Sequence, residues 1–367
     1  MSDWRFIIDH NSYADFSVSV SPAIERAVVT GESPPTVYLC MFDADSITIG
    51  VNEDPEQALD LAFCDQHKIA FRRRLNGGGA IYAGKGSALI VLTLKTDHDR
   101  VPETSAEAFP QILTAFAETF ARRYGFAAEY RPLNDIQVEG RKLVPTSLKI
   151  ENGVMTLRIV VNLKPIDTEM AGRAMPMPPE KVQDKELKDL TSRFTWLERE
   201  AKREISDAEL EAFTLECIEY AFGETDLNRS GLTAAENIYA EEFRTQFESD
   251  NWLFGKSERN RFGDMLRPGD TVGRGRVKAM GGMIRATLAV RDGRVLHAII
   301  NGDWHPRPID AIAWLEDELT GIVAEPAALN DCAGAFLDRT DIEFAGVEKA
   351  DLGAALEKAL ADQKPGV

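Results

Sequence analysis

Hydrophobic and polar positions follow distinct periods along the first part of the chain, and these periods predict a mixture of strands and helices. A continuous apolar run at residues 88–94 predicts a strand that is covered on both faces. Residues 37–50 are rich in β-branched and aromatic side chains and are broken by a polar turn at residues 43–45, so we expect strands there. Over residues 106–124 apolar side chains recur near helical period up to Gly125, which predicts a helix.

Two dipeptides mark hairpin turns. Asn152-Gly153 lies inside the strand-like residues 148–162, and Asp292-Gly293 separates the apolar runs 283–290 and 295–300. Asn-Gly and Asp-Gly adopt the positive φ values that tight hairpin turns need. Each pair therefore predicts two antiparallel strands. A further strand is expected at residues 136–142.

Helical patterns occupy most of the remaining chain. They cover residues 55–67, 198–222, 233–247, 310–319 and 351–360. From about residue 165 the sequence becomes helical and highly charged, and strand-like sequence returns after residue 248. We therefore expect an α+β fold: a larger domain of mixed sheet and helices at residues 1–247, and a small α+β domain at residues 248–367.

Charge and composition exclude several classes of protein. The chain has 367 residues and a formal net charge of -18, whereas a nucleic-acid binder or a protein held on an anionic membrane surface would be basic. No apolar run approaches the ~20 residues of a membrane-spanning helix, and the start of the chain lacks a secretory pattern. The four cysteines form no C-x-x-C pair, so neither a disulfide framework nor a zinc site is expected. We expect a cytoplasmic protein.

The most unusual local sequence is a run of three arginines followed by three glycines. It reads Arg72-Arg73-Arg74-Leu75-Asn76-Gly77-Gly78-Gly79-Ala80. Glycine lets backbone N–H groups approach an anion, and arginine supplies charge-assisted hydrogen bonds, so the run predicts an anion or nucleotide site rather than a solvated turn. It is not a P-loop, because Gly86 replaces the required hydroxyl residue and a strand follows instead of a helix.

A second polar cluster lies about sixty residues further on. Asn134 and Asp135 carry hard oxygen atoms that suit Mg²⁺ or a ribose hydroxyl. Lys142 follows a Glu139-Gly140 turn, and on a strand its side chain could point either to solvent or into a site. Taken alone, the solvent-facing interpretation would be the better one for Lys142.

Together, these two clusters resemble those of a known family. The order of motifs is similar to that of the biotin/lipoate A/B protein ligase family, in particular its lipoate-protein ligase A branch with a C-terminal accessory domain. The matching motifs are Arg73-Arg74-x-x-Gly77-Gly78-Gly79-Ala80, Asn134-Asp135, Gly140-Arg141-Lys142, Ser192-Arg193-x-x-x-Leu197, Trp252-Leu253-Phe254-Gly255 and Gly302-Asp303-Trp304. They extend over nearly the whole chain in the expected order.

The resemblance implies a two-step reaction. Lipoate attacks the α-phosphate of ATP, with Mg²⁺, and the resulting lipoyl-adenylate modifies a lysine of an acceptor lipoyl domain. By the resemblance Lys142 is the catalytic residue and holds the lipoyl carbonyl oxygen and the phosphate, while Asp135 faces the nucleotide or its Mg²⁺. The remaining substrate- or adenylate-binding residues implied are Arg74, Asn76, Gly77, Gly78, Gly79, Ala80 and Asn134. Arg73 is expected to be adjacent and could be structural.

Two alternatives stay open. The sequence departs from the family pattern at Ala83-Gly84 and at residues 143–147, and related octanoyl-transferring enzymes use a cysteine nucleophile. The chain could therefore be an ATP-independent octanoyl or lipoyl transferase between carrier proteins, or a divergent member that only binds lipoyl groups. Because buried cysteines usually behave as small hydrophobic residues, we expect no covalent thiol catalysis here.

Overall fold

The chain forms two compact units in a computed structural model, which describes residues 3–132, 134–176 and 194–366. Unit 1 consists of Met1–Ile47, Tyr82–Gly172 and Lys185–Gln246, and unit 2 of Thr48–Ile81, Arg173–Asp184 and Phe247–Val367. Packing defines these units, and the sequence boundary between residues 247 and 248 stays a prediction. Among the described residues no helix is both long and apolar enough to cross a membrane.

Unit 1 is built on a mixed sheet with helices on both faces. In the described part the sheet order is β11-β1-β2-β6-β10-β9-β8-β7, with β1 parallel to β2 and to β11 and the other neighbours antiparallel. The strands are β1 (Arg5–Asn11), β2 (Thr36–Phe42), β6 (Ser87–Lys95), β7 (Glu129–Arg131), β8 (Asp135–Val138), β9 (Arg141–Glu151), β10 (Val154–Asn162) and β11 (Asn228–Arg229). The helices are α1 (Tyr13–Thr30), α4 (Ser105–Tyr124), α5 (Thr168–Ala174), α7 (Leu197–Ala201), α8 (Asp207–Phe222) and α9 (Ala234–Glu248).

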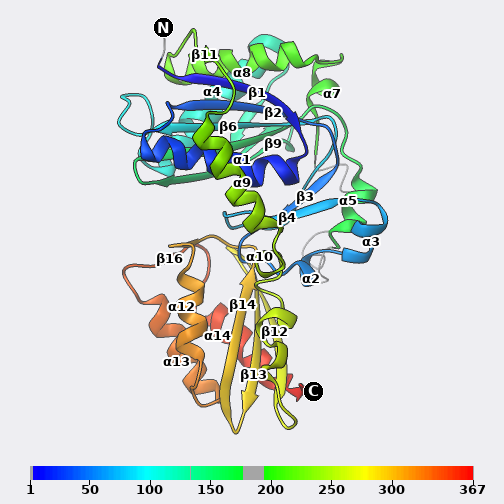
Figure 1. The fold of residues 1–367 in the computed structure, drawn as a ribbon, viewed down its shortest axis with the longest axis vertical. Coiled ribbons are helices and arrows are strands. Elements are labelled where there is room, and N and C mark those ends of the chain that lie inside the picture. Colours follow the sequence, from blue (N-terminus) through cyan, green and yellow to red (C-terminus); the bar gives the residue numbers. More distant parts are fainter. Residues whose placement is uncertain (1–2, 133, 177–193, 367) are drawn as a thin grey trace. The chain divides into compact units, whose positions relative to one another are not determined.

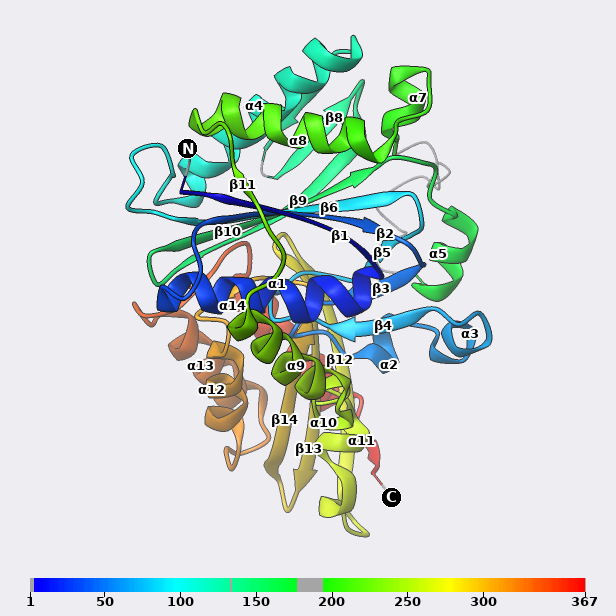
Figure 2. The ribbon, with the colours of Figure 1, turned by 45° about the horizontal axis from the view of Figure 1, so that its top comes forward.

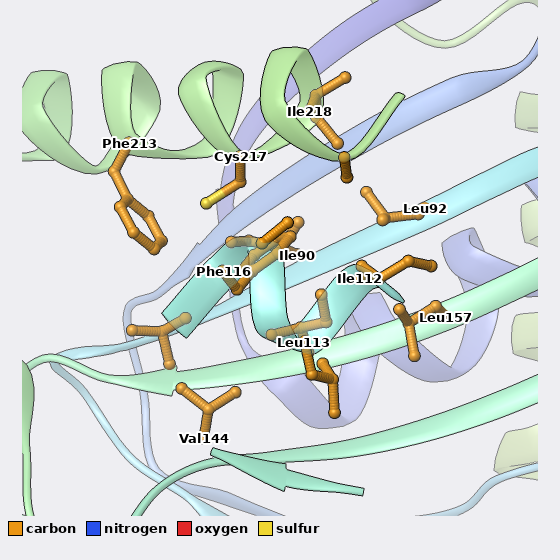
Figure 3. Packing of buried hydrophobic residues seen from close by; sticks show 14 of the residues in the cluster. Ile90, Leu92, Ile112, Leu113, Phe116, Val144, Leu157, Phe213, Cys217 and Ile218 are labelled. Carbon is orange, nitrogen blue, oxygen red and sulfur yellow. The ribbon is translucent and has the colours of Figure 1, made fainter. Parts of the chain in front are cut away.

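The main hydrophobic core lies between this sheet and helices α4 and α8. Phe116 of α4 and Phe213 of α8 pack edge to face, with ring centroids 5.9 Å apart, over Leu92 and Leu157 of the sheet (Figure 3). Helix α1 lies on the opposite face (Figure 2). Strand β6 is therefore covered on both sides, which confirms the expectation from its unbroken apolar run.

Unit 2 joins an antiparallel sheet of order β14-β13-β12-β17 to a helical layer. Its strands are β4 (Ala70–Arg73), β12 (Thr271–Ala279), β13 (Gly282–Arg291), β14 (Arg294–Gly302), β15 (Pro306–Arg307), β16 (Glu343–Phe344) and β17 (Lys364–Pro365). Its helices are α2 (Pro55–Ala58), α3 (Leu61–Gln66), α10 (Asp250–Leu253), α11 (Glu258–Arg261), η2 (Gly263–Met265), α12 (Ala311–Leu319), α13 (Pro326–Leu337) and α14 (Lys349–Ala361). Strand β3 (Ser46–Ile49) pairs with β4 (Figure 1), and β5 (Ile81–Ala83) pairs with the other edge of β3, which gives a small sheet of order β4-β3-β5.

Both predicted hairpins are present. Asn152 and Gly153 have φ values of 54° and 71° between β9 and β10, and Asp292 and Gly293 have 50° and 70° between β13 and β14. Two successive residues with positive φ are typical of a type I′ turn, whose twist matches that of the strands. The dipeptides therefore set the register next to each turn, and in the β13–β14 pair the register shifts between Ala289 and Val290.

Two predicted helices are each divided in the structure. Residues 55–67 form α2 and α3, because the Asp60 carboxylate accepts a hydrogen bond from the Phe63 N–H at 2.9 Å and starts a new helix. Residues 198–222 form α7 and α8, because Lys202 adopts a left-handed φ of 56° and Ser206 begins α8 with a capping box. The prediction of one continuous helix over each range was wrong. The spacing of apolar residues alone does not reveal a residue inside the range that ends one helix or begins the next.

Candidate functional site

A β-bulge brings Lys142 and Asp135 together on one face of the β8–β9 hairpin in unit 1. Ile136 pairs with Val144, but the next residue, Gln137, pairs with Lys142, so Leu143 is the extra residue. Because side chains alternate along a strand, this extra residue moves Lys142 to the face that carries Asp135. The Lys142 Nζ lies 2.7 Å from Asp135 Oδ2, and the lysine side chain is 33 % exposed.

The turn and the strand end hold this pair in place. Glu139 and Gly140 have φ values of 49° and 77° and form the two-residue turn of the hairpin. The carbonyl oxygen of Lys142 accepts a hydrogen bond from the Thr195 N–H at 2.9 Å. The backbone at Lys142 is therefore held by residue 195 as well as by its pairing with Gln137 of β8. The side chain extends from a rigid backbone.

Asn134 and Asp135 have different environments. The Asn134 Nδ2 donates to the Thr146 carbonyl oxygen at 2.6 Å, and the Thr146 hydroxyl donates to the Asn134 carbonyl oxygen at 2.7 Å, so this amide group closes the open end of the hairpin. The second carboxylate oxygen of Asp135, Oδ1, is buried and accepts no hydrogen bond from the described residues. Asp135 therefore has one buried carboxylate oxygen that no hydrogen-bond donor among the described residues reaches.

That oxygen fits a Mg²⁺ ion only as a single ligand. Within the described ranges, no three His, Cys, Asp or Glu side chains gather as a metal site. Mg²⁺ commonly binds one or two carboxylates and completes its shell with water and substrate phosphates. The donor set is compatible with an ion that arrives with a nucleotide, rather than with a resident metal.

In unit 2, Arg73 is a structural residue. It is 2 % exposed, and burial lowers its pKa to about 10, so it remains a cation at neutral pH. Its guanidinium donates hydrogen bonds of 2.5–2.7 Å to carbonyl oxygens of two separate segments. The acceptors belong to Val51, Glu53, Trp252 and Leu253. The side chain therefore joins residues 51–53 to helix α10.

The glycine loop, residues 74–80, is shaped by Arg74. Its guanidinium donates to the carbonyl oxygens of Thr48 at 3.1 Å, Gly77 at 2.6 Å and Gly79 at 2.9 Å. The Asn76 carbonyl oxygen accepts from the Val51 N–H at 3.0 Å, and Gly78 adopts a left-handed φ of 89°. Ala80 follows in the loop before β5. The loop is a folded turn around one guanidinium group.

The sequence-predicted residues thus form two groups. Asn134, Asp135 and Lys142 come together in the β8–β9 hairpin of unit 1, and residues 74–80 come together in unit 2. Of the matched motif near Trp196, Ser192 and Arg193 lie outside the described residues. Sequence reasoning missed the bulge at Leu143, because nothing in the apolar pattern marks it.

All four cysteines are unfavourable as nucleophiles. Burial raises the pKa of Cys40 to about 12 and raises that of Cys217 well above the usual value for a thiol. Burial also raises the pKa of Cys64 and Cys332. A thiolate is the reactive form, so each of these sites disfavours it.

Known proteins match both the sequence and the fold. The family model described as "Lipoyl protein ligase A/B catalytic domain" matches residues 16–219, more than half of the chain. "Octanoyltransferase LipM" of Brevibacillus brevis is 24% identical over 69% of this chain and 99% of its own length. "Lipoate--protein ligase 1" of Staphylococcus aureus is 23% identical over 86% of this chain and 89% of its own length.

Solved structures share the fold. P. falciparum LipL1, in a structure described as a complex with lipoate, superposes with a TM-score of 0.67 at 13% identity and covers 98% of this chain and 100% of its own. Lipoate-protein ligase A bound with ATP has a TM-score of 0.58 at 17% identity, covering 69% of this chain and 99% of its own. The α+β, biotin/lipoate ligase-like fold expected from the motifs is confirmed. This chain belongs to the lipoyl protein ligase A/B catalytic domain family.

Proposed function

We propose that this protein activates lipoate, or a lipoate-like acid, with ATP and transfers the acyl group to a lysine of an acceptor lipoyl domain. In the first step a carboxylate oxygen attacks the α-phosphorus and the bond to pyrophosphate breaks. In the second step the acceptor amine attacks the acyl carbon, the bond to AMP breaks, and the amine loses a proton. Both steps build negative charge on oxygen atoms near phosphate.

The Lys142 ammonium group is the observation that carries this proposal. It stands on a fixed backbone, is 33 % exposed, and has a carboxylate 2.7 Å away. An ammonium group placed where negative charge develops stabilises the transition state strongly, because no protein reorganisation is needed during the reaction. We assign Lys142 to the acyl carbonyl oxygen and the phosphate. In this role its bond to Asp135 would be exchanged for bonds to the substrate.

Supporting roles follow from the other described contacts. Asp135 Oδ1, buried and without a hydrogen-bond donor among the described residues, would hold a ribose hydroxyl or one face of a nucleotide-bound Mg²⁺. Mg²⁺ would neutralise phosphate charge when bound. In the proposal, Gly77, Gly78 and Gly79 form the adenylate loop and Arg74 shapes it, since its donors already serve the loop's own carbonyl oxygens.

A transferase without ATP is the second candidate, because several relatives are named octanoyltransferases. The environment of the cysteines favours the ligase instead. A thioester route needs an accessible thiolate, whereas Cys40, Cys64 and Cys217 are buried and the pKa of each of the four thiols is raised. A divergent protein that only binds lipoyl groups is the third candidate.

Intact mass spectrometry of acceptor domains separates the three candidates. We would incubate the protein with ATP, Mg²⁺, lipoate and a panel of apo lipoyl domains that includes the host's own. A ligase adds the lipoyl mass only when ATP is present. Acyl transfer from an octanoyl-carrier protein without ATP would instead support the transferase. No acyl mass on any acceptor under either condition would contradict both enzymes.

A further inference from the structure

The end of strand β14 packs directly on the glycine loop within unit 2. This segment, residues 302–305, is called here the Trp304 corner. The Gly302 N–H donates to the Asn52 carbonyl oxygen at 2.8 Å, and the Gly78 N–H donates to the Trp304 carbonyl oxygen at 3.2 Å. One of the glycine-loop amides is therefore held by residues more than two hundred positions later in the chain.

The corner explains why glycines are required in the loop. A Cβ atom at Gly77 would lie 2.6 Å from the Trp304 carbonyl oxygen and 3.0 Å from the His305 Nδ1. At Gly78 it would lie 3.1 Å from both the Cε1 and the Nε2 of His305, and at Gly79 it would lie 3.3 Å from Asp303. The imidazole of His305 thus covers the backbone of two glycines that have no side chain to displace it.

Trp304 fixes the position of this imidazole. Its side chain is 0 % exposed, and its ring lies 4.8 Å from that of Phe344 in the hydrophobic core of unit 2. A fully buried tryptophan anchors the backbone on either side of it. His305, the next residue, is therefore presented to the glycine loop by a rigid anchor rather than by a mobile turn.

The charges around His305 favour its neutral form. Burial lowers its pKa, the positive charges of Arg74 and Arg307 lower it further, and Asp303 opposes them. Arg74 is the side chain whose hydrogen bonds shape the loop. A second positive charge on His305 would repel this guanidinium group, whereas a neutral ring can pack beside it.

We propose that His305 is a positioning residue of the glycine loop: its neutral imidazole covers Gly77 and Gly78 and keeps Arg74 bonded to the loop carbonyl oxygens. The inference rests on the proposed function only for its activity readout. Protonation of His305 loosens the loop, so the loop is ordered for an anionic adenylate near neutral pH and loses that order in acid. His305 acts through the loop and Arg74.

The test compares His305→Gln and His305→Ala with His297→Gln. His297 is a matched control, because it lies in the same unit, burial and Arg261 also lower its pKa, and it accepts from Arg261 Nε at 3.1 Å rather than contacting the glycine loop. We would measure lipoate-dependent pyrophosphate release from pH 5.5 to 8, and amide hydrogen-exchange protection of residues 76–80 over the same range.

Because the pKa of His305 is lowered from the ordinary histidine value of 6.5, we expect wild-type activity to fall only at a pH below that value, and the loop to lose protection in parallel. His305→Gln should remove this acid limb, and His297→Gln should keep it. His305→Ala should reduce kcat/KM by roughly 10- to 100-fold, because small displacements of a positioning group have effects of that size. It should also lower loop protection at every pH.

Unchanged loop protection in His305→Ala, or an acid limb that persists in His305→Gln, would overturn the inference. The exchange measurement needs no activity. If wild-type protein releases no pyrophosphate at any pH, the proposed function fails, while loop protection in the three variants still decides the role of His305.

Discussion

In unit 2, the guanidinium groups of Arg73, which precedes the glycine loop, and of Arg74, within it, donate hydrogen bonds to backbone carbonyl oxygens. In the β8–β9 hairpin of unit 1, the Lys142 ammonium group faces one carboxylate and is 33 % exposed. The run of arginines and glycines predicted an anion site by itself, whereas Lys142 taken in isolation favoured a solvent-facing residue and was predicted to be catalytic only from the family resemblance. Among the described residues, the two arginines donate to backbone carbonyl oxygens and so determine the shape of the chain around the loop, whereas Lys142 has one carboxylate partner that a substrate could replace.

The largest expected effect comes from removing the buried guanidinium group beside the loop. Arg73→Ala leaves the carbonyl oxygens of Val51, Glu53, Trp252 and Leu253 without this donor, and we expect a loss of about 3–5 kcal/mol in the free energy of unfolding. Denaturant-induced unfolding, followed by the fluorescence of the tryptophans, measures it. Arg73→Lys should recover little, because one ammonium group cannot reach two segments in the geometry of a guanidinium group.

Arg72→Ala is the matched control for this variant. Arg72 pairs with Glu248 at 3.1 Å, and the glutamate side chain is 48 % exposed, so the pair is accessible to water. An exposed ion pair contributes about 0–1 kcal/mol, and we expect a change within that range. Equal losses in the two variants would contradict the structural role assigned to Arg73.

Lys149, on the same strand β9 as Lys142, allows a second comparison, with a smaller expected change in the free energy of unfolding. Lys149 Nζ lies 2.6 Å from Glu25 Oε1, nearly the distance of the Lys142–Asp135 pair, but Arg158 lies 3.5 Å from the same carboxylate group. Burial opposes ionisation of Glu25, yet Arg158 and Lys149 outweigh it and lower the pKa of the carboxyl group. Burial likewise opposes the charge on Lys149, but Glu25 outweighs it and raises the pKa of the lysine.

The pair therefore stabilises the fold over a defined pH range. Its contribution is complete between the ordinary values of 4.5 for Glu25 and 10.5 for Lys149. Below pH 4.5 it is lost as Glu25 takes up a proton, and above pH 10.5 it is lost as Lys149 releases one. Lys149→Ala should lower the free energy of unfolding at pH 7 by about 1–3 kcal/mol and weaken this dependence below pH 4.5. An unchanged acid limb would show that Glu25 is not anchored by Lys149.

The smallest expected effect is that of thiol reagents. Because burial raises the pKa of all four cysteines, we expect slow labelling of the native protein by iodoacetamide, at the partly exposed Cys332 first, and no loss of acyl transfer. Mass spectrometry of labelled protein and residual activity measure both. Loss of activity in proportion to the labelling of a single cysteine would favour the transferase over the ligase.

The sequence predicted well what depends on local pattern. The strand at residues 88–94 and the hairpins at Asn152-Gly153 and Asp292-Gly293 are found, because apolar runs and positive-φ dipeptides act over a few residues. The helix at residues 106–124 ends at Gly125, whose left-handed φ of 76° is a common helix end. The order of the motifs also identified the family.

The sequence predicted less well what depends on distant packing. The orientation of Lys142 follows from a bulge at Leu143, and the role of the glycines follows from contacts with Trp304 and His305, more than two hundred residues away. Neither the bulge nor these long-range contacts produce a repeating pattern of apolar and polar residues. No short stretch of sequence could therefore have shown them.

We propose that Lys142, and not its counterpart Lys149 on the same strand, serves the chemistry. The most direct measurement is lipoate-dependent pyrophosphate release from ATP by Lys142→Ala and Lys149→Ala, with the free energy of unfolding of each variant measured beside it. We expect Lys142→Ala to lose activity per folded molecule on the order of 100-fold or more, and Lys149→Ala to keep its activity per folded molecule. Each variant removes an ion pair of similar length, 2.7 Å and 2.6 Å, so both lose some stability and the activity of the folded protein separates them. Equal activity in Lys142→Ala and the wild type would contradict the catalytic role of Lys142.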